Sequence, residues 1–242
     1  MRTVVFLGPT LDAGEARSLI DAEIKGPARQ GDVFRAVRDG AEVIGLVDGL
    51  FETVPAVLHK EILWALDRGV RVVGAASMGA LRAAELHPFG MEGIGAVFAA
   101  YRDGHLIDDD EVAVVHGPAE LGYLPLSVAM VDLRASFAEA ARSGVVSGAE
   151  ADHCIACAKR LHYKDRSYEG AIEAAGLDAG PAGRALRDWL KDHRVERKKM
   201  DARELLFHLA AISERGRAPV PRFSFQESHW WSHHLGHQGA LK

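Results

Sequence analysis

The sequence predicts an α/β fold, in which a mostly parallel sheet with helices on both faces (a Rossmann-like core) precedes a C-terminal helical region. Three observations predict it. In the first half of the chain, short apolar runs alternate with stretches of helical spacing. Glycines separate most of these runs from the stretch that follows. Beyond Pro118 the apolar runs give way to helical stretches alone. Alternation of this kind is typical of βαβ units.

The predicted strands of the core are short runs rich in β-branched residues. They are TVVFLG, which begins at Thr3, AEVIGLVDG, which begins at Ala41, and VRVVGAA, which begins at Val70. The run EVAVVH, which begins at Glu111, is expected to add a further strand. Ligands of parallel sheets bind beyond the carboxyl ends of the strands, so we expect a site at that edge.

The predicted helices of the core carry start and stop signals. In GDVFRAVRDG, Asp32 is expected to cap the helix and Gly40 to end it. In TVPAVLHKEILWALDRG, we expect Thr53 at the cap, Pro55 in the first turn and Gly69 at the end. LDAGEARSLIDA and SMGALRAAEL also have the spacing of helices, so each predicted strand is followed by one or two helices.

We expect three segments, namely an α/β core over residues 1–118, a mainly helical region over 119–215, and an aromatic, His-rich and partly mobile tail over 216–242. In the helical region, LSVAMVDLRASFAEAARSG stops at Gly144. Ser147 and Glu150 form a capping box for the next helix. A third helical stretch is predicted over about 183–215.

Composition bounds the class of protein. The chain has 242 residues, of which 48% are hydrophobic and 26% charged, as in ordinary globular proteins. Two cysteines exclude a disulfide framework. We see no leader and no run long enough to cross a bilayer, so we expect a cytoplasmic protein with no membrane partner.

The net charge of −5 is unevenly distributed along the chain. Residues 184–222 carry 11 Lys and Arg against 6 Asp and Glu. The segment KDHRVERKKMDARELL mixes both signs with apolar residues, which favours a solvated helix face over a nucleic-acid site. We therefore expect no nucleic-acid partner, with a docking surface for an acidic protein as the alternative.

Ser77 lies in GAASMGALRAAEL, between a predicted strand and a predicted helix. At such a position the amide groups of Met78 and Gly79 could stabilise an oxyanion, and Arg82 could hold an anionic group. The context AASMGA lacks the first glycine of a G-x-S-x-G elbow, but it resembles the serine context of the Clp-type peptidases. Ser77 is therefore either a nucleophile or a helix N-cap among small residues that allow close packing.

A nucleophilic serine needs a base. Lys60 and His59 are the candidates nearest in sequence, and His116 is the other one. The neighbours of His59 are apolar, which favours a buried, hydrogen-bonded histidine, and Lys60 can act as a base only if burial lowers its pKa. Asp48 and Glu52 follow a predicted strand and could orient a base or bind a cation, but a turn carboxylate and a capping residue explain them almost as well.

Three other motifs contain metal-binding residue types. The acidic run Asp108–Glu111 lacks the spacing of a calcium loop and is interpreted as a solvated turn. Cys154 and Cys157 form a CxxC inside a helix with no second pair, so we interpret them as core residues rather than zinc ligands or a redox pair. The tail histidines, which could hold a metal if helical, are His229, His233, His234 and His237. We predict no metal site and no cofactor in this chain.

Several long segments together resemble the TfuA-like family, which is named for its link to trifolitoxin synthesis. They are VFLGPTL, ARQGDVFRAVRDGAEVIGLVDGLFETVPAVLHKEILWALDRGVRVVGAASMGALRAAEL and FGMEGIGAVFAAYRDGHLIDDDEVAVVHGPAE. The resemblance covers residues 3–135 and continues more loosely through LHYKDRSY and RKKMDARELL.

The resemblance implies work beside a YcaO protein, which uses ATP to activate a backbone amide of a ribosomally made peptide, usually to give a thioamide. ATP and Mg²⁺ are expected on that partner, since this chain has no G-x-x-x-x-G-K-[ST]. The precursor peptide would be an indirect partner only. The TfuA-like protein is expected to deliver or release sulfide, or to stimulate YcaO allosterically, and a homodimer is compatible with either role.

The resemblance gives Ser77 a specific hypothesis. A sulfur-carrier protein that ends in a thiocarboxylate is an acyl donor, from which serine attack would expel hydrosulfide. Lys60, or else His59 or His116, would be the base, and Asp48 or Glu52 would orient it. Two alternatives remain, a non-catalytic adaptor or allosteric activator of YcaO and a stand-alone serine hydrolase of a small ester or amide.

Overall fold

A five-stranded, fully parallel sheet forms the centre of the first part of the chain, in the order β2-β1-β3-β4-β5. The computed structural model describes residues 1–50, 52, 54–212, 223–227 and 231. The strands are β1 (Thr3–Phe6), β2 (Glu23–Lys25), β3 (Val43–Leu46), β4 (Arg71–Ala75) and β5 (Glu92–Ile94). The predicted α/β class is confirmed, and the predicted runs from Thr3, Ala41 and Val70 contain β1, β3 and β4.

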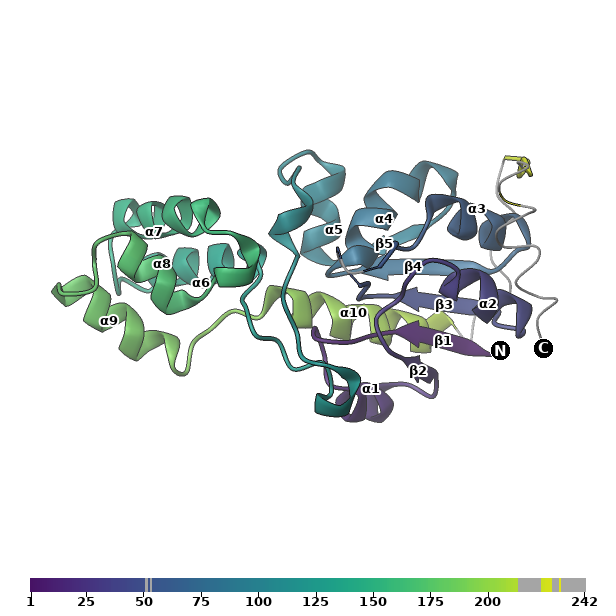
Figure 1. Ribbon diagram of the computed structural model, residues 1–242, viewed down its shortest axis with the longest axis horizontal. Coiled ribbons are helices and arrows are strands. Elements are labelled where there is room, and N and C mark those ends of the chain that lie inside the picture. The colour runs from purple at the N-terminus through teal and green to yellow at the C-terminus, as the bar shows by residue number, and fades with distance from the viewer. Residues whose placement is uncertain (51, 53, 213–222, 228–230, 232–242) are drawn as a thin grey trace.

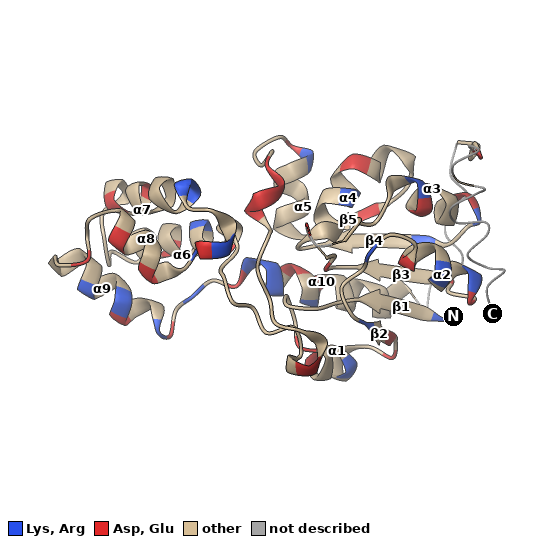
Figure 2. Ribbon diagram, viewed as in Figure 1, with Lys and Arg blue, Asp and Glu red and all other residues tan. Residues whose placement is uncertain are grey.

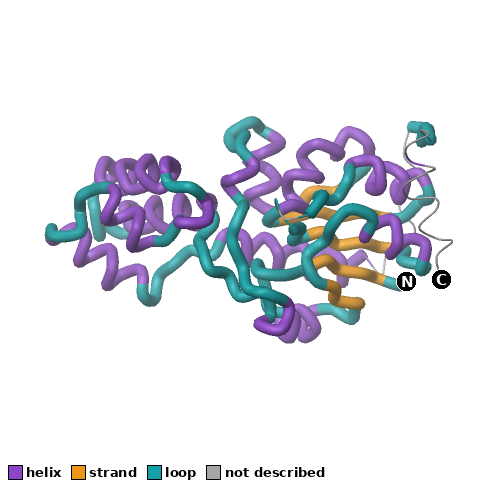
Figure 3. The backbone as a smooth tube through the Cα atoms, viewed as in Figure 1, coloured by secondary structure: helices purple, strands orange, loops and turns teal. Residues whose placement is uncertain are grey.

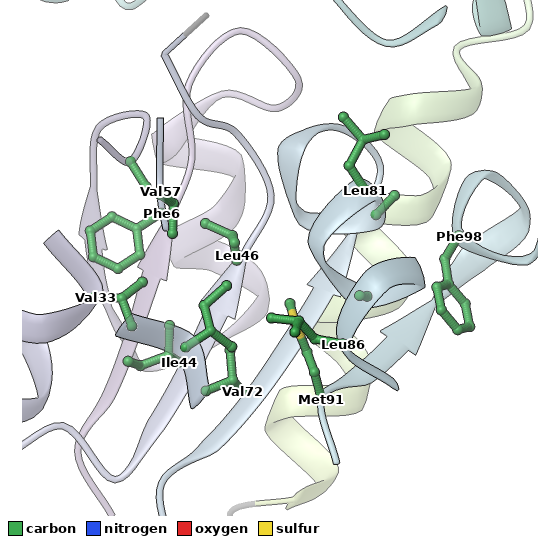
Figure 4. Packing of buried hydrophobic residues seen from close by; sticks show 14 of the residues in the cluster. Phe6, Val33, Ile44, Leu46, Val57, Val72, Leu81, Leu86, Met91 and Phe98 are labelled. Carbon is green, nitrogen blue, oxygen red and sulfur yellow. The ribbon is translucent and has the colours of Figure 1, made fainter. Parts of the chain in front are cut away.

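Both faces of the sheet are covered by helices (Figure 1). The helices on one face are α2 (Asp32–Arg38), α3 (His59–Asp67), α4 (Met78–Leu86) and α5 (Gly95–Arg102). Those on the other are α1 (Ala13–Leu19) and α10 (Arg197–Ile212). Because side chains alternate along a strand, Val4 and Phe6 join the first core whereas Val5 joins the second. Figure 4 shows how the apolar side chains of strands and helices meet in the first core.

A second helical unit has a core of its own. It consists of α6 (Met130–Arg142), α7 (Gly148–Arg160), α8 (Tyr168–Ala174) and α9 (Pro181–Leu190), which lie beside the sheet domain in Figure 1. The predicted capping box of Ser147 and Glu150 is present at the start of α7. Cys154 and Cys157 are buried in this core, as predicted, and burial raises the pKa of the Cys154 thiol to about 11. We refer to α6–α9 as the bundle.

Helix α10 leaves the bundle and returns to the sheet. Its residues Leu205, Leu206 and Leu209 pack against strand residues of the second core. At its start, the Lys198 Nζ donates to the Val112 carbonyl at 2.8 Å. One turn later the buried Asp201 carboxylate accepts a hydrogen bond from the Val97 N–H at 2.7 Å. The last described helix therefore completes the α/β layer structure.

The structure corrects four predicted elements. Helix α3 begins at His59 rather than after Thr53, which itself lies outside the described residues. The chain before it is held extended because carbonyls there accept tertiary hydrogen bonds, as Val57 does from Arg82. Gly31, not Asp32, occupies the N-cap of α2. The stretch predicted over 183–215 is two helices, α9 and α10, because the chain turns at residues 191–196 to bring α10 onto the sheet.

The fourth correction concerns EVAVVH, which is not a strand of the sheet. It begins in the 3₁₀ turn η2 (Asp109–Glu111) and continues as an irregular segment between the sheet domain and the bundle, visible as a loop in Figure 3. Its one ladder contact is an isolated antiparallel bridge between His116 and Pro125. The remaining 3₁₀ turns are η1 (His87–Phe89), η3 (Ala119–Leu121) and η4 (Tyr163–Asp165).

Among the residues that the structure describes, no helix has both the length and the apolar character needed to cross a bilayer.

Candidate active site at the carboxyl edge of the sheet

Ser77 stands at a sharp turn between β4 and α4. The residue before it, Ala76, has a φ of +65°, a left-handed conformation that is strained for a residue with a Cβ atom. The Ser77 N–H donates to the Ala75 carbonyl at 2.7 Å, which closes the turn. A strained strand-to-helix turn of this kind holds a serine rigidly at the end of its strand, as in the nucleophile elbow of serine hydrolases.

The Ser77 side chain occupies the N-cap position of α4 without acting as a cap. Its backbone has a φ of −121° and a ψ of −124°, and its hydroxyl accepts no hydrogen bond from the first turn. Ser147, at the equivalent position of α7, does accept one from the Glu150 N–H, at 3.2 Å. The capping interpretation of Ser77 therefore does not hold, and its hydroxyl is left for another partner.

The N–H groups of the first two residues of α4 differ in their hydrogen bonding. The Gly79 N–H donates to the Val47 carbonyl at 3.1 Å, and a Cβ atom on Gly79 would lie only 1.7 Å from the Leu46 carbonyl oxygen. Gly79 thus brings α4 against β3. The Met78 N–H, in contrast, makes no hydrogen bond with any described residue, and neither does the N–H of Gly49 after β3.

Ser77, Met78 and Gly49 line a cavity of about 210 Å³ at the carboxyl ends of β3 and β4, called cavity 1 below. Its opposite wall consists of the consecutive residues Val112–His116, and its rim includes Tyr163 and Lys164 of η4. The sheet domain and the bundle therefore both contribute to it. Ser77 is 8% exposed, so its hydroxyl faces a sheltered space rather than open solvent.

Asp48 also lines cavity 1, but its carboxylate is fully engaged. It accepts hydrogen bonds from the N–H groups of Gly8 and Thr10, at 2.9 and 3.0 Å, and from the Thr10 hydroxyl at 2.6 Å. The side chain is buried. It joins the loop after β1 to the loop after β3 and so fixes the floor of the site.

Glu52 does not line cavity 1, but it contacts two residues that do. Its carboxylate accepts a hydrogen bond from the Tyr163 hydroxyl at 2.8 Å and pairs with the Lys164 Nζ at 2.9 Å. The Lys164 ammonium, followed by the Tyr163 hydroxyl, holds the pKa of Glu52 below its usual value, and the same pairing raises the pKa of Lys164. Lys164 is accordingly a permanent cation at the cavity rim rather than a base.

His116 is the predicted base that lies in the wall of cavity 1. Its Nδ1 is 2.8 Å from the Gly117 carbonyl oxygen. A carbonyl only accepts hydrogen bonds, so Nδ1 carries the proton in the neutral ring and Nε2 keeps a lone pair. The Tyr123 ring packs edge-on against the imidazole at 5.6 Å between centroids and restricts its rotation.

The other predicted partners of Ser77 do not line this cavity. His59 pairs with Glu85 at 2.7 Å on the surface. The Lys60 ammonium lies 5.5 Å from the centroid of the Phe225 ring. Arg82 donates to the Val57 carbonyl and pairs with Glu85. These three side chains form contacts between α3, α4 and their neighbours.

The acidic run is a structural junction rather than an open cation site. Carboxylate oxygens of Asp108, Asp110 and Glu111 lie within 4.8 Å of one another. The Lys159 ammonium of α7 pairs with all three, at 3.0 Å from Asp108 and 2.9 Å from Glu111. Figure 2 shows this acidic turn between α5 and the bundle. The tail histidines at 229, 233, 234 and 237 lie outside the described residues.

Sequence reasoning missed Tyr163, Lys164 and the Gly49 amide. Tyr163 meets Glu52 across 111 positions of sequence, a separation that no local pattern reveals. The available signal was the segment LHYKDRSY, noted only as a loose part of the family resemblance.

Residues 48–167 match the TfuA-like protein family. The chain belongs to the TfuA-like family. Among curated proteins, none matches this TfuA-like chain. The matched segment begins at Asp48 and contains every cavity residue discussed above, from Ser77 and His116 to the Tyr163–Lys164 pair. The TfuA-like family is associated with YcaO proteins and with thioamide formation in ribosomally made peptides.

Proposed function

We propose that this TfuA-like protein releases sulfide from the C-terminal thiocarboxylate of a sulfur-carrier protein, for use by a YcaO partner in backbone thioamidation. The observation that carries the proposal is the Ser77 hydroxyl, which leaves its own helix uncapped and lies in a sheltered cavity with His116. The proposed setting is the cytoplasm, where the free Cys154 and Cys157 would stay reduced.

The reaction is an acyl transfer in two steps. The Ser77 Oγ attacks the thiocarboxylate carbon while the Nε2 of His116 accepts the hydroxyl proton. The same nitrogen then passes this proton to the sulfur, the C–S bond breaks, and hydrosulfide leaves. Water, deprotonated by the same nitrogen, then attacks the ester carbon, the bond to Oγ breaks and the serine regains its proton. The net reaction converts thiocarboxylate and water into carboxylate and hydrogen sulfide.

Two main-chain groups are suited to stabilise the tetrahedral intermediates. Met78 and Gly49 line cavity 1, and their N–H groups have no partner among the described residues. One follows the nucleophile and the other comes from the loop after a neighbouring strand, which is the arrangement of oxyanion donors in α/β hydrolases. The positive end of the α4 dipole adds to them, and the Lys164 ammonium favours the approach of an anionic thiocarboxylate.

A non-catalytic adaptor is the second candidate, and one observation favours it. Three leucines at the end of η3 and on its connection to α6 are largely exposed, Leu121 at 65%, Leu124 at 57% and Leu126 at 65%. Exposed apolar side chains that lie close together are typical of protein-binding surfaces. Docking of the YcaO partner there is compatible with catalysis at Ser77, but it would also suffice for a purely allosteric role.

The decisive experiment measures sulfide release from a thiocarboxylated sulfur-carrier protein. Ser77→Ala is expected to lower kcat by at least about 10³-fold, as loss of a nucleophile does in serine hydrolases. The matched control is Ser18→Ala, on the exposed face of α1, with activity close to that of the wild type. Because the Ser77 hydroxyl makes no cap bond, both variants should unfold at nearly the same urea concentration as the wild type.

Addition of inorganic sulfide separates the two candidates. In a reconstituted thioamidation with the YcaO partner, a sulfide donor becomes dispensable once sulfide is supplied, whereas an adaptor is still required. Unchanged release by the Ser77→Ala variant, together with a persistent requirement for the chain in the presence of sulfide, would leave only the adaptor.

A further inference from the structure

The wall of cavity 1 has one paired edge and one unpaired edge. The Val115 N–H donates to the Ser127 Oγ at 2.9 Å, and its carbonyl accepts from the Leu126 N–H at 2.7 Å. Two residues on, the Gly117 N–H donates to the Leu124 carbonyl at 2.8 Å. The segment thus forms a short ladder with the returning chain, towards which Val115 directs both main-chain groups and Gly117 its N–H.

Main-chain groups of successive residues in an extended chain point to opposite edges. Val114 and His116 therefore direct their N–H and carbonyl groups away from the ladder. None of these four groups is hydrogen-bonded to a residue that the structure describes. Both residues are only partly exposed, and sheltered main-chain groups without partners are costly unless water or a ligand satisfies them.

Both residues of this unpaired edge belong to the lining of cavity 1. Five consecutive residues, Val112–His116, line cavity 1, whereas Pro125–Ala129 of the ladder partner line a second cavity of about 280 Å³ instead. The two cavities share Pro9 and Val114, so they adjoin each other along the same segment. A bound peptide that runs along this edge would therefore have one end in cavity 1, which Ser77 also lines, and the other end in the second cavity.

We propose that the edge formed by Val114 and His116 binds an extended peptide, the C-terminal tail of the acyl donor, as an added β-strand that leads its terminal carbonyl to Ser77. This inference rests on the proposed function. Pairing with both residues would span about 7 Å of tail, at roughly 3.3 Å per residue, which a cavity of this size accommodates whereas a folded domain would not fit.

Strand addition makes a specific statement about recognition. The tail is held by its main chain, so its amide groups rather than its side chains determine binding. Only alternate residues of the tail face the edge, since the groups of the residues between them point away. Residues further from the terminus enter the second cavity, whose lining includes Arg194 and Lys199.

The test uses synthetic acetylated tetrapeptides with a C-terminal thiocarboxylate, in which one amide nitrogen at a time is methylated. Binding is measured to the Ser77→Ala variant, and kcat/KM for sulfide release is measured with the wild type, with thioacetate as a donor without a tail. Methylation at the position that faces the edge is expected to weaken binding and kcat/KM by about tenfold, the usual worth of one hydrogen bond. Methylation of the adjacent amide should change the binding affinity and kcat/KM by less than about twofold.

The outcomes for the tail and for the reaction are separable. Alternation in the binding series supports the edge, whatever the result with thioacetate. Equal effects at adjacent amides, or no binding of any tetrapeptide, overturn it. Ser77-dependent hydrolysis of thioacetate and tetrapeptides without alternation would leave the proposed function standing and remove the edge. Alternating binding with no hydrolysis of any thioacid would support the peptide-binding edge and remove the proposed function.

Discussion

Ser77 and Ser147 show how one residue type takes two roles at the same helical position. Both stand at the N-cap, but Ser147 has the extended backbone that directs its hydroxyl to the first turn, whereas Ser77 does not. A capping hydroxyl contributes about 1 kcal/mol to stability. At Ser77 that contribution is absent, and the left-handed Ala76 adds strain. Backbone strain and lost local stability of this kind are concentrated at functional sites.

His116 and His59 provide a matched pair of variants. His116→Gln is expected to lower kcat for sulfide release by about 10²- to 10⁴-fold, because the variant lacks a proton acceptor in the cavity. His59→Gln should leave kcat within about twofold, since His59 pairs with Glu85 on the surface. The readout is kcat for sulfide release, measured for both variants under the same conditions.

A large loss of kcat in His59→Gln, with none in His116→Gln, would move the base to α3 and contradict the assignment.

The sequence could indicate Ser77, because a strand, small residues and a helix are local features. It could not choose among three basic side chains. That choice depends on which segments face the turn, and the wall that carries His116 comes from a connection about 40 residues later.

Helix α4 approaches the sheet more closely than any residue with a side chain would allow at its first turn. Gly79→Ala is expected to destabilise the protein by more than about 2 kcal/mol, since its Cβ atom would overlap the Leu46 carbonyl oxygen, 1.7 Å away. The control is Gly148→Ala at the start of α7, where a Cβ atom meets nothing within 4 Å and alanine should be neutral or stabilising by up to about 1 kcal/mol.

Urea unfolding of the two glycine variants checks this expectation. Equal midpoints for Gly79→Ala and the wild type would show that α4 can move away from β3 at little cost. Sulfide release by Gly79→Ala should fall along with stability, because the same helix turn carries Ser77 and the Met78 amide.

Elements with clear local start and stop signals were predictable from the sequence, and those defined by tertiary contacts were not. The capping box at Ser147 and the β-branched runs of β1, β3 and β4 are local signals, and all of them are present. EVAVVH has the same composition as a strand, yet it pairs with its own returning chain. The turn before it is held by Lys159 and Arg166 of the bundle, and this long-range pairing directs the segment away from β5.

At the scale of the whole molecule, Asp132 joins the bundle to α10. Its carboxylate, at the start of α6, accepts a hydrogen bond from the Lys198 N–H at 3.1 Å. Burial raises the pKa of Asp132 to about 6; the Lys198 ammonium opposes this shift and Glu196 adds to it. The junction between the two units therefore contains a carboxyl group that titrates in mildly acidic solution.

The sign of the resulting pH dependence follows from linkage. The folded state binds the Asp132 proton more tightly than the unfolded state, so this contribution to stability is complete below pH 4 and is lost as the pH rises through about 6. The Asp132→Asn variant lacks this titration. We therefore expect its free energy of unfolding, relative to that of the wild type, to increase by roughly 2 kcal/mol as the pH rises from 4 to 6. Urea denaturation at pH 4, 5, 6 and 7 measures it, and a constant difference would contradict the assignment.

Because α10 comes late in the chain and, among the described residues, shares with α1 the covering of one face of the sheet, synthesis order matters for this protein. All five strands leave the ribosome more than a hundred residues before α10 does. During that interval the bundle can fold on its own core, while Val5, Val43 and Val73 stay in contact with water. The nascent chain is thus most prone to aggregate before α10 has been synthesised, and any truncation ahead of residue 197 would make that vulnerable stage permanent.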